Sequence, residues 1–314
     1  MSSSGRASSC GSSTPSASEG PCAVAIGRRA TVIAVLGGLG AAVFFSIGTL
    51  ASSRSSRMLG SNAVLGWVML IGLAVVAPLV ALIGIPANLS QQTIIWLLFS
   101  GAGNVSGLML EYAALRIGKV GLVAPIASTE GAIAAVIAVI AGEPLSAIEA
   151  LTLAVIAIGV VLAALVPEDL EAVESPSSRR AILLSGGAAI GFGVSLYATG
   201  RIGADLPIPW VLLPARLIGV AAIAIPLMAR RRLRLTRPVV PLVLAGGLCE
   251  LIGFTSYTIG ARDAIAVSAI LVSQFATIST IVAWLLFHER LARLQVLGVA
   301  VVIVGVAALT LLQA

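Results

Sequence analysis

The sequence predicts an all-α membrane protein with ten transmembrane helices, arranged as two inverted repeats of five helices each. Hydrophobic residues form 59% of the 314-residue chain and charged residues only 10%, whereas a soluble domain carries roughly 25% charged residues. The apolar residues fall in runs of about 20, the length that crosses a bilayer as a helix. Marker residues of the first half also recur in the second half at one constant spacing.

The first element is a Ser-rich, low-complexity stretch at residues 1–29. Such a composition cannot bury enough apolar surface to fold. We therefore expect a disordered tail that ends at a membrane anchor formed by Arg28 and Arg29. No apolar core precedes residue 30, which makes a secretory signal the poorer interpretation.

Ten apolar runs follow the tail. Each is predicted to be a helix, because lipid-facing backbone must satisfy its hydrogen bonds internally. The longest polar break, residues 167–180, is expected to link a first repeat at 30–166 to a second repeat at 181–314. The expected spans are 30–50, 62–85, 93–115, 120–141, 145–166, 181–200, 207–229, 239–260, 264–287 and 294–312.

The duplication is marked by residue pairs that share the spacing from Glu143 to Glu289, which is 146 positions. Because each repeat has an odd number of helices, the second copy should lie upside down in the membrane. Inverted repeats are typical of secondary transporters, whose substrate binds near the midplane between the repeats. The pairs are Gly101 and Gly247, Gly107 and Gly253, Arg116 and Arg262, Glu143 and Glu289, and Gly159 and Gly305.

Glu143 and Glu289 are interpreted as structural repeat markers. Glu143 stands between two apolar runs and precedes Pro144, a residue that suits a first helical turn. A carboxylate near a helix N-terminus is also favoured by the helix dipole. We therefore expect Glu143 to cap its helix–helix hairpin rather than to bind substrate.

Two stretches, "IAVIAGEPLSAIEALTLAVIAIGVVLAAL" and "AWLLFHERLARLQVLGVAVVIVGVAAL", resemble the EamA family of the drug/metabolite transporter superfamily. "LLPARLIGVAAIAIP" is similar to the family's Arg-bearing second helix, with Arg216 in that place. The resemblance covers residues 30–312. It implies secondary transport, often export, of small metabolites, amino acids or drugs by alternating access.

The sequence departs from the family pattern at two places. Glu130 and Ala276 stand where the family usually has proline. The second run of the first half, "LGWVMLIGLAVVAPLVAL", also lacks the arginine. The two halves therefore differ in their polar residues, which argues against a symmetric mechanism.

Polar residues inside the spans are costly, so each is a candidate substrate or ion ligand. Arg216 is expected near mid-membrane, as an anchor for an anionic substrate group or a counter-ion for an acidic side chain. The alternatives are a structural ion pair and snorkelling to the interface.

Glu130 lies in the middle of the fourth run. A buried carboxylate there can load and release a proton near neutral pH; the alternative is a protonated packing group beside Ser128 and Thr129. Pro125 and Gly131 flank it and would allow a local helix break, where transporters place binding groups.

Glu250 and its repeat partner Asn104 are both polar, which favours a lined cavity over a buried pair between Glu250 and Arg216. Glu111 lies near the end of its run, where an interfacial position is the simpler interpretation. Weaker candidates are Tyr197, Tyr257, Gln274 and Ser128.

We expect no enzyme, no catalytic residue, no cofactor and no metal site. The chain has one histidine, His288, no HExxH motif and no Asp inside a span. The expected partners are a small-molecule substrate and the lipid bilayer. We expect the chain to cross the cell (plasma or inner) membrane several times. Nucleic acid is not an expected partner. A membrane sensor or scaffold is the alternative, and an intramembrane enzyme a poorer one. The sequence leaves monomer and homodimer open.

The substrate and the orientation are less constrained. Four Trp and three Tyr predict no dense aromatic cage for quaternary amines. Lys and Arg at the polar breaks number 5 on the N-terminal side and 13 on the opposite side, so the positive-inside rule places both termini outside. The resemblance implies cytoplasmic termini, and on balance we favour that orientation from the sequence.

Overall fold

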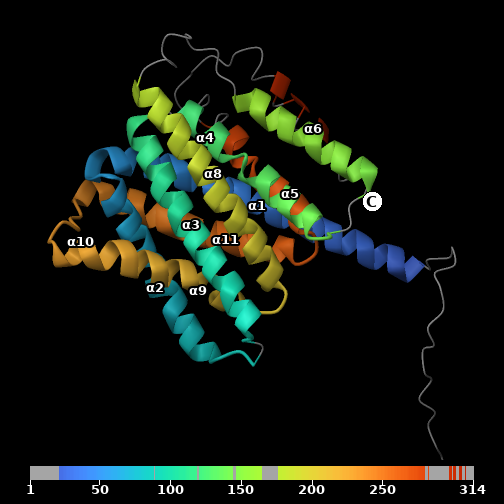
Figure 1. The fold of residues 1–314 in the computed structure, drawn as a ribbon, viewed down its shortest axis with the longest axis horizontal. Coiled ribbons are helices and arrows are strands. Elements are labelled where there is room, and N and C mark those ends of the chain that lie inside the picture. Colours follow the sequence, from blue (N-terminus) through green and yellow to red (C-terminus); the bar gives the residue numbers. More distant parts are fainter. Residues whose placement is uncertain are drawn as a thin grey trace, which may run out of the picture.

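The computed structural model describes residues 21–87, 89–118, 120–143, 146–164 and 176–279, together with residues 282, 297, 298, 300, 301, 304, 305 and 308. All regular elements in these ranges are helical (Figure 1). In order they are α1 (Pro21–Leu59), α2 (Ser61–Ile83), α3 (Gln91–Ile117), α4 (Val120–Ala127), α5 (Glu130–Ile140), α6 (Ala147–Ala164), α8 (Pro176–Gly203), α9 (Ile208–Gly219), a π-helical turn (Val220–Ala224), α10 (Ile225–Ala229), a 3-10 turn (Arg237–Val239), α11 (Val240–Ala261) and α12 (Ile265–Val272).

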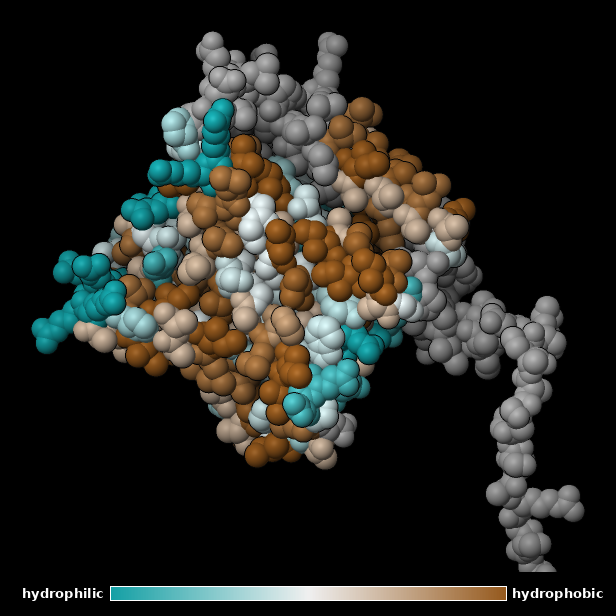
Figure 2. Space-filling model, viewed as in Figure 1, coloured by the Kyte–Doolittle hydropathy of each residue, from teal (hydrophilic) through white to brown (hydrophobic). Residues whose placement is uncertain are grey.

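Within the described residues, 7 helical stretches are long and apolar enough to cross a membrane. Large apolar side chains are exposed along them, such as Leu36, Leu82 and Ile140, and Figure 2 shows broad hydrophobic areas over the helices. Exposed apolar area on this scale needs lipid or a partner to cover it. The all-α membrane class is thus confirmed. The ten-helix, two-repeat layout stays a prediction, because most of the tenth expected span lies outside the described residues.

The first helix is longer than expected at both ends. It begins at Pro21, so residues 21–29 belong to α1 rather than to a tail, and it continues through "SSRSSR", which the sequence suggested as a break. The Ser55 hydroxyl donates a hydrogen bond to the Ala51 carbonyl of the same helix (2.8 Å), so its polar group has a partner within α1. The Arg57 guanidinium reaches the carbonyls of Leu115 and Gly118 at the end of α3. Likewise α8 begins at Pro176, so residues 176–180 of the expected linker are helical.

The two halves pack against each other through corresponding helices. α1 lies along α11, and α3 lies along α8 (Figure 1). α2 and α9 run antiparallel, because each donates a tryptophan hydrogen bond to the segment beyond the other's C-terminal end. Trp67 Nε1 donates to the Arg234 carbonyl (3.3 Å) and Trp210 Nε1 donates to the Gly84 carbonyl (2.8 Å).

Two of the glycines that mark the repeat, Gly107 and Gly253, have equivalent surroundings in the two halves. A Cβ at Gly107 of α3 would overlap the Phe192 ring of α8, and a Cβ at Gly253 of α11 would overlap the Phe45 ring of α1. These two glycines lie 146 positions apart in the sequence. They therefore create equivalent seats for an aromatic ring in the two halves.

Two apolar segments are broken in the middle. α4 ends at Ala127 and α5 begins at Glu130, with a turn at Ser128 and Thr129. This confirms the break that Pro125 and Gly131 predicted. The ninth expected span is broken too, because α12 ends at Val272 and helix resumes at residue 275. The sequence did not predict this second break, although its position corresponds to the first within one residue.

Candidate functional site

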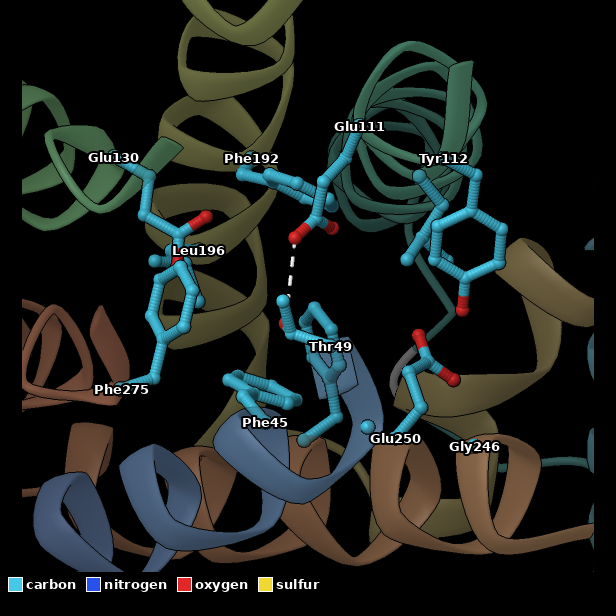
Figure 3. Close-up of a pocket in the computed structure, with 13 residues that line it drawn as sticks. Phe45, Thr49, Glu111, Tyr112, Glu130, Phe192, Leu196, Gly246, Glu250 and Phe275 are labelled. Carbon is cyan, nitrogen blue, oxygen red and sulfur yellow. Dashed lines mark hydrogen bonds between the residues drawn. The ribbon is translucent and has the colours of Figure 1, made fainter. Parts of the chain in front are cut away.

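A cavity of about 40 Å³ lies where the broken helices meet the paired helices of the two halves (Figure 3). A water molecule needs roughly 10–15 Å³ measured in this way, so the cavity holds about three waters. It is too small in this conformation for a drug-sized ligand. The lining residues are Phe45, Gly48, Thr49, Leu108, Glu111, Tyr112, Glu130, Phe192, Leu196, Gly246, Glu250, Phe254 and Phe275.

Phenylalanine rings form much of the cavity wall. Phe45 of α1 and Phe254 of α11 meet edge to face, with ring centroids 5.2 Å apart. Phe192 of α8 and Phe275, just after the second helix break, complete the set. The sequence-based expectation counted only Trp and Tyr, and so it did not consider these phenylalanines. Two of the four carried a signal in the sequence, because Phe254 follows the repeat glycine Gly253 directly and Phe275 lies at the second helix break.

Three carboxylates line the same cavity: Glu111, Glu130 and Glu250, each only 5% exposed. The Thr49 hydroxyl donates to Glu111 Oε1 (3.3 Å), as Figure 3 shows. No described residue gives the Glu130 carboxylate a hydrogen bond or an ion pair. Glu130 is the first residue of α5, where the positive end of the helix dipole favours an acidic group.

The structure brings Glu111 into the cavity wall, whereas the sequence favoured an interfacial position without a role in the site. Glu111 stands two helical turns after Asn104 on α3, so both side chains point to the same face. That i, i+7 relation to a recognised candidate was the signal in the sequence. Glu130 and Glu250, in contrast, are candidates that the sequence analysis named and the structure places in the cavity wall.

Behind Glu250 lies a buried polar network. Arg216 is 1% exposed and forms an ion pair with Glu250 Oε2. Asn104 Nδ2 donates to Glu250 Oε1 (3.1 Å). The Arg216 side chain runs over Gly72 of α2, where a Cβ would collide with it. Glu250 thus both lines the cavity and pairs with Arg216, so the two roles that the sequence suggested as alternatives are combined in one residue. Arg216 itself lies outside the cavity wall, and its burial excludes snorkelling.

The four weaker candidates lie outside the cavity wall. The Tyr257 hydroxyl donates to the Leu196 carbonyl (2.8 Å), and Ser128 donates to the Pro125 carbonyl (2.7 Å). Tyr197 packs edge to face on Trp96, with ring centroids 5.6 Å apart. Gln274 is buried, and its amide atoms have no partner among the described residues. It lies at the second helix break, next to Phe275.

Glu143 caps a helix, but of the other half of the chain. Both of its carboxylate oxygens accept a hydrogen bond from Ala266 N (3.2 Å), in the first turn of α12. Burial raises the pKa of Glu143, while the N–H groups of Ala266 and Ile265 act to lower it. The expected hairpin cap is therefore corrected to a cap between the two halves. Glu289, its repeat partner, lies outside the described residues, as do His288 and Pro144.

Three comparisons bear on the identity of the chain. A family model described as the EamA-like transporter family matches residues 32–165. The fold matches 21 chains of solved structures. One of them, described only as the crystal structure of a protein, superposes with a TM-score of 0.71 and is 19% identical, covering 90% of this chain and 98% of its own. No match was found among curated proteins. At this identity the structural likeness shows the fold alone.

Proposed function

Residues 32–165 belong to the EamA-like transporter family, and from this premise we propose that the chain is a proton-coupled secondary exporter of small molecules in the plasma or inner membrane. The family consists of membrane transporters of the drug/metabolite type, and the chain is a multi-pass membrane protein. The solved structure that covers 90% of the chain supports the same fold for the second half. A small buried cavity between two related halves supports a transporter better than it supports a sensor, a scaffold or an enzyme.

The observation that carries the proposal is the Glu130 carboxylate, which is buried in the cavity wall without a partner among the described residues. Leaving a lone ionised carboxylate in an apolar cavity is very costly. The group must therefore carry a proton or face a cation whenever the cavity is closed. Alternation between those two states is the chemistry that couples a proton gradient to solute movement.

The shape of the cavity supports alternating access. With room for about three waters, the cavity must widen before a solute can enter. The antiparallel α2 and α9 and the equivalent ring seats at Gly107 and Gly253 give the two halves similar surfaces on which to rock. Transporters with inverted repeats open by this kind of motion around a site at the repeat interface.

Glu130→Gln is expected to lower pH-gradient-driven flux by about tenfold or more, because the amide cannot exchange a proton. The measurement is solute flux in proteoliposomes across a panel of metabolites and drugs, with an imposed pH gradient. Asp263→Asn is the matched control, since Asp263 is an exposed carboxylate in the turn before α12. Wild-type flux in Glu130→Gln would contradict proton coupling, and no flux from the wild-type protein on any panel member would contradict transport.

We also propose an orientation opposite to the one favoured from the sequence. Basic residues gather at one end of the bundle. Arg57 contacts the end of α3, Arg116 and Arg180 line one surface pocket, and Trp67 joins this end to Arg234. Figure 2 shows hydrophilic residues over α10 and the start of α8. The other end carries Arg201 and Arg262 beside Asp205, Asp263 and Glu143.

Under the positive-inside rule, the arginine-rich end faces the cytoplasm and the C-terminus lies outside. A C-terminal alkaline phosphatase fusion should therefore be active, and a C-terminal green fluorescent protein fusion should be dark. A second variant replaces Arg230, Arg231, Arg232 and Arg234 with glutamine. Because it removes positive charge from the cytoplasmic end, it should move a fraction of the chains to the opposite orientation. A bright fluorescent fusion with an inactive phosphatase fusion would reject this orientation.

A further inference from the structure

We propose that the cavity, once it has widened, binds an organic monocation with an apolar body, held by Glu111 and Glu130 against the phenylalanine walls. This inference rests on the proposed transport function and names the substrate class of the same site. It follows from the charges that line the cavity, from the chemistry of its walls and from the engagement of the nearby arginine.

The side chains that line the cavity can become negative but not positive. Three carboxylates face it, and the one guanidinium nearby, that of Arg216, is already paired with Glu250. In the part of the chain that the structure describes, neither Glu111 nor Glu130 forms an ion pair. A positively charged ligand would supply a counter-charge that lets one of these carboxylates ionise, whereas an anion would find no unpaired cation among the described residues that line the cavity.

The same geometry disfavours a zwitterion such as a free amino acid. Its carboxylate would need a cationic or N–H partner inside the cavity. Arg216 lies behind Glu250 and is held there by that ion pair, while Asn104 donates to the other oxygen of Glu250. A carboxylate ligand would have to displace Glu250 from both partners, which would leave a buried glutamate unpaired.

The walls indicate an organic cation rather than a metal ion. Phe45, Phe192, Phe254 and Phe275 line the cavity, and a cation over the face of an aromatic ring is attracted by the ring's negative face. Hard metal ions instead require several oxygen ligands around them. Among the described residues, no three His, Cys, Asp or Glu side chains are placed to hold a metal ion. An amine or quaternary ammonium on an apolar body fits both features.

Cation binding would be coupled to proton release at these carboxylates. When the cavity is empty, a proton neutralises each unpaired carboxylate; when a monocation enters, one carboxylate gives up its proton to solvent and becomes the counter-ion. One positive charge enters and one leaves, so the net charge of the site is unchanged. The exchange therefore predicts that cation binding weakens as pH falls.

The test uses the full-length protein in lipid nanodiscs and three probes of matched size: benzyltrimethylammonium, its uncharged carbon isostere neopentylbenzene, and benzenesulfonate. Calorimetry should show the cation binding at least about tenfold more tightly than the other two, a difference of about 1.4 kcal/mol. Affinity should fall as pH is lowered, and binding in weak buffer should release protons. Glu111→Gln and Glu130→Gln should each weaken cation binding about tenfold, while Asp263→Asn should not.

The outcomes separate the substrate class from the transport function. Equal binding of the cation and neopentylbenzene, tighter binding of benzenesulfonate, or cation binding independent of pH would each overturn the cation proposal. If either glutamine variant fails to fold, the pH dependence and proton release of the wild-type protein decide the matter. Flux of anionic or neutral solutes without cation binding would overturn the substrate class but leave the transport function standing. Cation binding without any flux would contradict the transport function but leave the cation site standing.

Discussion

Arg216→Met is expected to destabilise the folded protein by about 3–5 kcal/mol, because it leaves the Glu250 carboxylate buried and unpaired. Arg216 is 1% exposed and Glu250 5% exposed, so at most the few waters of the cavity can replace the lost ion pair. Methionine keeps much of the volume of the arginine stem over Gly72, which limits the effect of an empty space. The loss therefore comes chiefly from the uncompensated charge.

The measurement is thermal unfolding of the detergent-solubilised protein, followed by size-exclusion fluorescence, for Arg216→Met, Glu250→Gln and the double variant. The double variant removes both charges and places a side-chain amide within reach of Asn104, so it should be more stable than Arg216→Met alone. Arg201→Met is the matched control, since Arg201 is exposed at the end of α8. A double variant no more stable than the single one would show that Arg216 acts by packing rather than by its charge.

The sequence predicted the membrane class and most helices, because lipid leaves the backbone so few options. It erred where polar side chains find their hydrogen-bond partners inside the protein rather than in water. "SSRSSR" looked like a loop, but Ser55 donates to its own helix and Arg57 reaches the carbonyls that end α3, so α1 continues. Composition alone does not contain that information, because the partners of Arg57 lie 58 and 61 positions away.

Part of the candidate site could be predicted from the sequence. Glu130, Glu250 and Arg216 stood out because a charge in mid-span needs an explanation. The rings of Phe45 and Phe192 did not, since an apolar residue in a span is ordinary, and their place in the cavity depends on how α1 pairs with α11 and α3 with α8. The place of Glu111 in the cavity depends on how α3 packs against α8 and α1. Helix pairing is a property of the assembled halves rather than of any single apolar run.

The two broken helices are in tight contact at Gly131, and Gly131→Ala is expected to have the second large effect. A Cβ there would overlap the Ala269 carbonyl and the Ser273 hydroxyl of the α12 segment. The carbonyl belongs to the backbone and cannot rotate away, so α5 and α12 must separate. Overpacking of this kind typically costs about 1–3 kcal/mol, which outweighs the gain of up to about 1 kcal/mol from replacing a helical glycine with alanine.

Gly186→Ala on α8 is the matched control, since no atom lies within 4 Å of its added Cβ and it should leave stability unchanged or raise it. Combining Gly131→Ala with Ser273→Gly should recover only part of the loss, because the Ala269 carbonyl remains. Thermal unfolding of the four proteins gives the comparison, and equal stability of Gly131→Ala and Gly186→Ala would refute the close approach. If solute enters by parting the broken helices, Gly131→Ala should also make Glu130 more accessible to solvent, which connects the packing at this glycine to the opening of the cavity.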